Sequence, residues 1–84
     1  MNRKDQFHYV RENPKNVRFE EFCNLIISLG FIHKGGKGSH RVFTKEGIPE
    51  IMTIQNCGGK AKPYQIRQFC KIVEQYHLLD YYEE

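Results

Sequence analysis

The sequence contains no hydrophobic run that could cross a membrane. Its longest uninterrupted apolar run is Leu25-Ile26-Ile27, whereas a membrane-spanning helix needs roughly 20 apolar residues. The N-terminal residues are polar, where a signal peptide would carry its apolar segment. We therefore expect a cytoplasmic protein without a membrane partner.

The chain is also poor in cysteine. Cys23, Cys57 and Cys70 form no CxxC pair and cannot all be paired, which argues against a disulfide framework. Cys23 and Cys70 fall on apolar helix faces, and Cys57 lies in a glycine-rich loop with no recognisable partner base. A zinc site needs four ligands at short spacings, which these cysteines and the four histidines do not offer. We expect reduced thiols and no metal or cofactor.

A chain of 84 residues that is 39% hydrophobic has room for one domain with one modest core. We expect residues 1–16 to form a polar N-terminal extension and residues 17–80 to form this domain. Residues 34–71 carry eight basic and two acidic side chains, a net charge of +6, whereas the rest of the chain carries five basic and eight acidic ones. Such a segregated basic region is typical of proteins that bind polyanions, although a solvated surface can cluster charge in the same way.

Hydrophobic spacing predicts two amphipathic helices. Apolar residues three and four apart occupy residues 19–29, and Gly30 supplies a C-terminal cap. The same spacing returns at residues 63–76, where Pro63 suits the first position of a helix. A further short helix, from about residue 4 to residue 11, would end before the next proline.

The segment between the two amphipathic helices favours three short strands, at residues 31–34, 39–45 and 50–55. They are separated by a glycine turn and by the turn at residues 46–49, and connections this short suit antiparallel neighbours. The order of helix, three strands and helix indicates an α+β fold. Both helices are expected to pack on one face of a three-stranded antiparallel sheet.

The segment from residue 59 to residue 63 (GKAKP) favours a ligand that carries phosphate. Lys60 and Lys62 lead directly into a helix N-terminus, where unsatisfied amides and the helix dipole attract anions. The alternative interpretation is an exposed loop, rich in glycine and lysine, that has no ligand.

A second glycine-rich segment, residues 35–43 (GGKGSHRVF), carries a histidine, and strand alternation allows two arrangements of it. If Phe43 points toward the helices, His40 lies on the open face of the sheet and Arg41 points inward. If Val42 points inward, the assignments are exchanged. We prefer the first arrangement because Phe43 has more apolar area to bury, although it could separate the histidine from the downstream lysines. The remaining histidines are expected to pack or face solvent, on helices (His8, His77) and on a strand (His33).

Four segments along the chain carry a resemblance to a known family: NPKNVRFEEFCNLIISLGF, GSHRVF, PEIMTIQN and GKAKPYQIRQFCKIVEQYHL. In this order they span residues 13–78, which resemble the HicA family of toxin–antitoxin mRNA interferases. The resemblance implies a fold similar to the double-stranded RNA-binding domain, with the order α-β-β-β-α. This is the order that the hydrophobic spacing also predicts.

The resemblance further implies a small endoribonuclease that cleaves mRNA and that a partner protein, the HicB antitoxin, neutralises. The family's functional histidine directly follows a Gly-Ser pair, which assigns the catalytic role to His40. Many relatives have a second histidine where this chain has Arg41, which cannot act as a base but can hold a phosphate. The residues expected to contact RNA are Lys34, Lys37, Gly38, Ser39, Arg41, Lys60 and Lys62.

We accordingly predict metal-independent cleavage in which the 2′-hydroxyl of RNA attacks the adjacent phosphorus and His40 acts as general base or acid. Histidine is the residue type whose ordinary pKa, about 6.5, suits proton transfer at neutral pH. Because no second acid is visible, we expect a slow nuclease. Two alternatives stay open: a non-catalytic RNA-binding module, and a partner-binding homologue that has lost nuclease activity.

Overall fold

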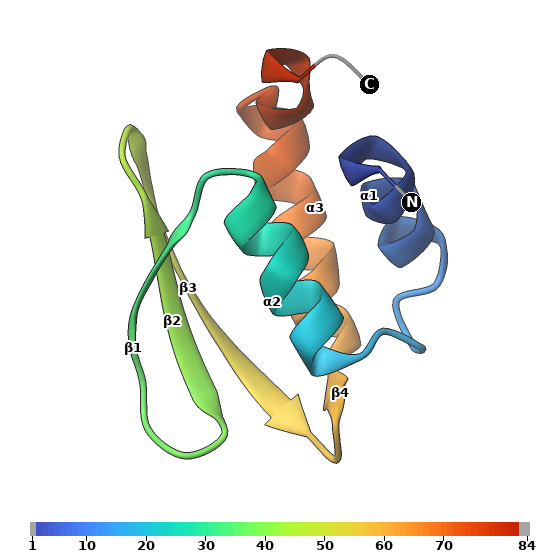
Figure 1. Ribbon diagram of the computed structural model, residues 1–84, viewed down its shortest axis with the longest axis vertical. Helices are drawn as coiled ribbons and strands as arrows, with labels where there is room; N and C mark the ends of the chain where they lie inside the picture. Colours follow the sequence, from blue (N-terminus) through green and yellow to red (C-terminus); the bar gives the residue numbers. More distant parts are fainter. Residues whose placement is uncertain (1, 83–84) are drawn as a thin grey trace.

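The computed structural model describes residues 2–82. Its elements in chain order are α1 (Arg3–Glu12), α2 (Phe19–Ser28), β1 (Ile32–Gly35), β2 (His40–Lys45), β3 (Ile48–Cys57), β4 (Lys60–Ala61), α3 (Pro63–Gln75) and the 3₁₀-helix η1 (Leu78–Tyr81). The strands form one antiparallel sheet in the order β1-β2-β3-β4 (Figure 1). The predicted α+β fold, similar to the double-stranded RNA-binding domain, is confirmed. Within these residues no helix is long and apolar enough to span a bilayer.

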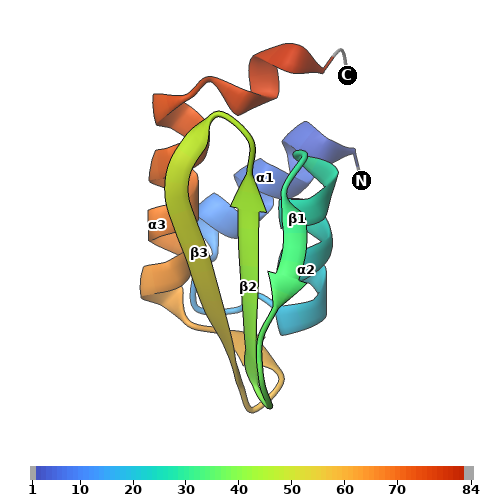
Figure 2. The ribbon, with the colours of Figure 1, turned by 90° about the vertical axis from the view of Figure 1, so that its left-hand side faces the viewer.

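Helices α2 and α3 cover one face of the sheet, and Figure 2 looks onto the other, uncovered face. Alternation along the strands explains this division. Phe43, Met52 and Ile54 are buried toward the helices. Ile51 and Thr53 alternate with them on β3 and are exposed. We call the uncovered side the open face of the sheet.

Phe69 of α3 lies at the centre of the core. Its ring contacts three other buried rings, from α1, α2 and the segment before β1: Phe7 (6.4 Å between centroids), Phe22 (5.4 Å) and Phe31 (6.1 Å). Edge-to-face and tilted arrangements of this kind are favourable for aromatic pairs. Four separate segments of the chain therefore meet at one side chain.

The expected N-terminal helix is present as α1. Asn2 caps it by accepting a hydrogen bond from the amide of Asp5 (2.8 Å). Phe7 is buried in the core, and Arg11 forms a 2.8 Å salt bridge with Glu74 of α3. The helix thus shares the core of the rest of the chain, and a domain boundary near residue 16 stays a prediction.

The hairpin of β2 and β3 is longer than predicted because its turn is shorter. The turn consists of Glu46 and Gly47 alone, and the φ of +86° at Gly47 favours glycine. Ile48 and Pro49, predicted to lie in the turn, therefore belong to β3. Proline is tolerated there because β4 pairs with β3 only at its far end, which leaves this edge of β3 without a neighbouring strand.

The two-residue strand β4 is an addition to the three predicted strands. Gly58 and Gly59, with φ of +61° and +88°, form a two-residue turn that brings Lys60 and Ala61 back beside the end of β3. Asn56 supports this turn by accepting a hydrogen bond from the amide of Gly59 (2.7 Å). Part of the segment that leads into α3 is thereby paired in the sheet.

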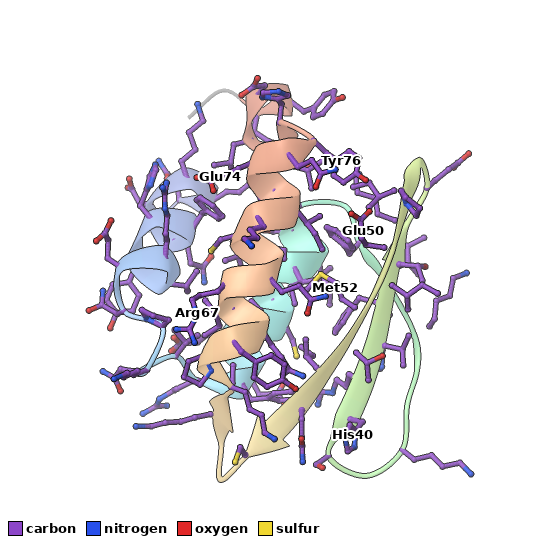
Figure 3. All side chains as sticks on the ribbon, turned by 180° about the vertical axis from the view of Figure 1, so that it is seen from behind. His40, Glu50, Met52, Arg67, Glu74 and Tyr76 are labelled. Atoms are coloured by element: carbon purple, nitrogen blue, oxygen red, sulfur yellow. The ribbon has the colours of Figure 1, made fainter. Side chains whose placement is uncertain are left out.

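Helix α3 ends at Gln75. The expectation that His77 lies on a helix is wrong: this residue has a left-handed backbone (φ 53°), which ends helical geometry before η1 begins. Figure 3 shows Tyr76 beside Glu50, and the tyrosine hydroxyl donates a hydrogen bond to the glutamate Oε1 (2.7 Å). This contact ties the end of α3 to β3.

Candidate nucleic-acid interface

The glycine-rich segment before β2 forms a tight turn that ends at His40. Gly35, Gly36 and Gly38 have φ of +143°, +135° and +60°, a region that favours glycine. A Cβ atom on Gly36 would collide with the carbonyl oxygen of His40, whereas one on Gly35 would meet no atom within 4 Å. The amide of His40 donates a hydrogen bond to the carbonyl of Lys37 (3.1 Å). The turn therefore holds the backbone of this histidine closely.

The side chain of His40 is exposed on the open face of the sheet. The residue pairs with Gln55 of β3 in the ladder. Phe43, on the same strand, is fully buried toward the helices, which confirms the preferred of the two strand arrangements. Figure 3 shows His40 at the start of β2, far from the Tyr76 end of α3. A ligand on the open face can reach the imidazole without rearrangement of the fold.

Arg41 projects to the other side of the sheet, toward α2. Its Nη1 and Nη2 donate hydrogen bonds to Oε1 and Oε2 of Glu20 (2.9 and 2.8 Å), and its guanidinium carbon lies 4.9 Å from the centre of the Phe19 ring. These hydrogen bonds are the main cause of a lowered pKa at Glu20 and a raised pKa at Arg41. The guanidinium is thus bound to a carboxylate. A contact between Arg41 and RNA stays a prediction.

Lys60 shares the open face with His40. Gln55 projects to the same side as His40 because paired residues of an antiparallel ladder face one way. Cys57, two residues further along β3, projects to that side again and pairs with Lys60 of β4. The confirmed strand arrangement therefore does not separate the histidine from this lysine. Lys62 is half-buried as the residue that precedes α3.

The other residues expected to contact RNA surround the glycine turn. Lys34, Lys37, Gly38 and Ser39 are all exposed. The carbonyl of Ser39 accepts a hydrogen bond from the amide of Asn56 (2.7 Å), which fixes the turn against the end of β3. These residues lie at the same end of the molecule as the histidine, and their role in RNA binding stays a prediction.

Gln65 of α3 supports the site, a role that was not predicted from the sequence. Its side chain is only 5% exposed. Its Oε1 accepts a hydrogen bond from the amide of Gln55 (3.0 Å), and its Nε2 donates one to the carbonyl of Thr53 (2.9 Å). These bonds satisfy backbone groups at the edge of β3 and so hold the cross-strand partner of His40 in place. The available signal was a glutamine directly before Ile66, on the apolar side of the predicted helix.

Arg18 is a second residue that the sequence did not single out. It directly precedes α2 and forms an isolated antiparallel bridge with Lys60. The basic surface at β4 therefore extends onto a segment that is far away in the chain. Local spacing carries no signal for such a pairing.

Residues 2–82 contain no group of three or more His, Cys, Asp or Glu side chains that could hold a metal ion. Cys23 and Cys70 are buried, as predicted, whereas Cys57, which was expected in a loop, is the exposed last residue of β3. Burial raises the pKa of Cys23, and it raises the pKa of Cys70 to about 11. Both buried thiols therefore stay protonated at neutral pH and act as small apolar side chains.

Two thirds of the chain match one family model, described as the HicA toxin of bacterial toxin–antitoxin. The match covers residues 19–74, from the start of α2 to the last turn of α3. The chain belongs to the HicA toxin family. It is thus the toxin of a toxin–antitoxin pair, and membership of the HicA family implies ribonuclease activity and an antitoxin partner. Helix α1 and η1 lie outside the matched residues. No curated protein and no solved structure matches the chain.

Proposed function

We propose that this HicA toxin is a metal-independent endoribonuclease that cleaves mRNA through His40. The observation that carries the proposal is the position of the imidazole: exposed at the start of β2, directly after a hydrogen-bonded glycine turn, and on the same face of the sheet as Lys60. Cleavage of RNA without a metal requires a group that moves a proton and cations that neutralise phosphate. This end of the open face offers both.

In the proposed reaction, the 2′-oxygen of a ribose bonds to the adjacent phosphorus while the bond from phosphorus to the 5′-oxygen breaks. His40 removes the proton from the 2′-hydroxyl or gives a proton to the leaving 5′-oxygen, and water supplies the other transfer. The products are a 2′,3′-cyclic phosphate and a 5′-hydroxyl. Positioned acid–base catalysis contributes roughly 10²- to 10⁴-fold, so a single such group predicts slow turnover.

The lysines around the histidine supply charge to the RNA backbone. Lys37 lies in the turn before the histidine, Lys60 lies two strands away on β4, and Lys62 directly precedes α3. Lys34 and Ser39 extend this surface, and Gly38 allows close approach of the backbone. Arg41 stays a predicted RNA contact, and we also assign it a positioning role, because Glu20 holds its guanidinium on the helix side of the sheet.

The proposal is tested by incubating single-stranded RNA with the parent protein and with His40→Ala in EDTA. We expect the parent to release fragments that end in 2′,3′-cyclic phosphate, and the variant to lose at least about 10²-fold in rate. His8→Ala, which removes an exposed histidine on α1, is the matched control and should cleave like the parent. Equal cleavage by His40→Ala, with a folded structure shown by circular dichroism, contradicts the assignment.

The same assay separates the alternative functions. Salt-sensitive RNA binding without cleavage indicates a non-catalytic binding module, and neither binding nor cleavage indicates a homologue that acts only through its partner. We further propose that the antitoxin is a HicB-like protein and that the toxin acts in the cytoplasm, where mRNA is translated. Co-expression with a HicB-like chain should abolish cleavage and yield a stable complex on size-exclusion chromatography.

A further inference from the structure

Arg18 and Lys60 stand directly opposite each other in the sheet. The amide of Phe19 donates to the carbonyl of Gly59 (2.9 Å), and the amide of Ala61 donates to the carbonyl of Val17 (2.9 Å). Hydrogen bonds on either side of a pair, rather than within it, mark a non-hydrogen-bonded antiparallel pair. In such pairs the Cα atoms approach to about 4.5 Å, and the side chains are close together.

Both side chains of this pair are cationic and project to the open face. Their neighbours Val17 and Ala61 are buried on the other side, whereas Arg18 and Lys60 are exposed. Lys60 Nζ lies 3.4 Å from Oδ1 of Asn16, a neutral group. Among residues 2–82 no carboxylate forms a salt bridge with either cation.

Like charges placed directly opposite each other destabilise a sheet. Glu20, the acid nearest to Arg18 along the chain, does not relieve this repulsion, because it is engaged by Arg41. An anion bound between the two cations would relieve it. A phosphate group suits this place because it can accept hydrogen bonds from a guanidinium and an ammonium at once.

The pair also lies on a continuous path from His40. The path follows the open face across neighbouring strands, from β2 to β3, β4 and the segment before α2. It therefore covers about three strand spacings of roughly 4.8 Å each. We propose that Arg18 and Lys60 together bind one phosphate of the RNA strand, a few nucleotides from the bond cleaved at His40. This inference rests on the proposed function and extends it to the course of the RNA.

The first test measures RNA binding without cleavage. Fluorescein-labelled single-stranded RNA is titrated with His40→Ala, alone and combined with Arg18→Ala or Lys71→Ala, at 50 to 300 mM salt. Lys71 is an exposed cation on α3, so its removal matches the change in net charge. We expect Arg18→Ala to weaken binding several-fold and to reduce the slope of log K against log salt by about 0.7, the value for one phosphate contact on a single strand. Equal slopes for the Arg18 and Lys71 variants overturn the inference.

The second test distinguishes a ligand site from a structural role. If the two cations repel each other, Arg18→Ala should melt at the same temperature as the parent or higher, while it binds RNA more weakly. Added salt should raise the melting temperature of the parent more than that of the variant, because salt screens the repulsion. A lower melting temperature for Arg18→Ala, together with weaker binding, means that the arginine supports the fold and overturns the proposal.

The third test places the phosphate on the RNA. RNA substrates that share one cleavage site are extended one nucleotide at a time, on the 5′ side or on the 3′ side of that site. KM is measured on each substrate for the parent and for Arg18→Ala. We expect the two proteins to diverge in KM, with kcat unchanged, only beyond a certain length on one side. Divergence on neither side overturns the inference even when the parent cleaves RNA. If the parent binds RNA through Arg18 but never cleaves it, the proposed function fails and the phosphate site stands.

Discussion

Arg41 donates one hydrogen bond to each carboxylate oxygen of Glu20, at 2.9 and 2.8 Å, across a gap of 21 positions in the chain. The pair joins the first turn of α2 to the start of β2, one residue after His40. Because the arginine projects to the helix side of the sheet, its neighbour projects to the open face. We infer that Glu20 is a positioning residue that fixes the imidazole through Arg41.

Removing this carboxylate should reduce turnover more than substrate binding. For Glu20→Gln we expect kcat to fall several-fold, and up to about 10²-fold if the histidine shifts by an ångström, while KM changes little. Glu21→Gln is the matched control, since Glu21 is a neighbouring exposed acid. The double variant Glu20→Arg, Arg41→Glu should recover part of the lost rate. An unchanged kcat in Glu20→Gln contradicts a positioning role for Glu20.

The same pair should make stability depend on pH. The hydrogen bonds from Arg41 hold the pKa of Glu20 below its usual value in the folded protein, so this contribution is fully present above the unfolded pKa of about 4.3. It is lost as pH falls through the lowered folded value. The melting temperature of the parent should exceed that of Glu20→Gln at pH 7, and the two should converge in acid, below the lowered folded pKa of Glu20. A constant difference across this range contradicts the prediction.

The glycine turn offers a matched pair of variants. Gly35 and Gly36 both have strongly positive φ, but only a Cβ on Gly36 meets the carbonyl oxygen of His40. We expect Gly36→Ala to reduce RNA cleavage by about tenfold or more through displacement of the histidine, and Gly35→Ala to reduce it much less. Circular dichroism should show intact helices in both. Equal activities mean that backbone strain, rather than the collision, governs this turn.

Phe69 should dominate the stability of the fold. It is fully buried and contacts rings from three other parts of the chain. Phe69→Ala should cost roughly 3–5 kcal/mol in free energy of unfolding, measured by urea denaturation, and Phe69→Leu clearly less. A loss below about 1 kcal/mol for the alanine variant would show that the surrounding rings close the cavity.

The three cysteines should differ sharply in reactivity. Cys57 is exposed, whereas Cys23 and Cys70 are buried, with the pKa of Cys70 raised to about 11. Only the thiolate is nucleophilic, so brief treatment with N-ethylmaleimide at pH 7 should label Cys57 alone. Mass spectrometry should then find one adduct on the native protein and three after denaturation. Rapid labelling of Cys70 in the native state contradicts its burial.

The elements that could be predicted from the sequence are those whose hydrophobic pattern extends over many residues. The amphipathic helices α2 and α3 and the alternation around Phe43 follow from local spacing, so both helices and the exposure of His40 were predictable. Strand β4 was not, because two residues after a glycine pair have no periodicity of their own. Nor could the sequence predict the pairing of Glu20 with Arg41 or of Arg18 with Lys60. Each depends on segments that only the folded topology brings together.

The first and last of the residues that the structure describes, 2–82, lie close to each other. The guanidinium carbon of Arg3 lies 3.8 Å from the ring centre of Tyr82, near the η1 end of α3, and Figure 1 shows this region opposite the turn that carries Gly58 and Gly59. Labels or immobilisation tags attached at this place would leave the His40 end free, which makes the toxin well suited to single-molecule measurements of RNA cleavage.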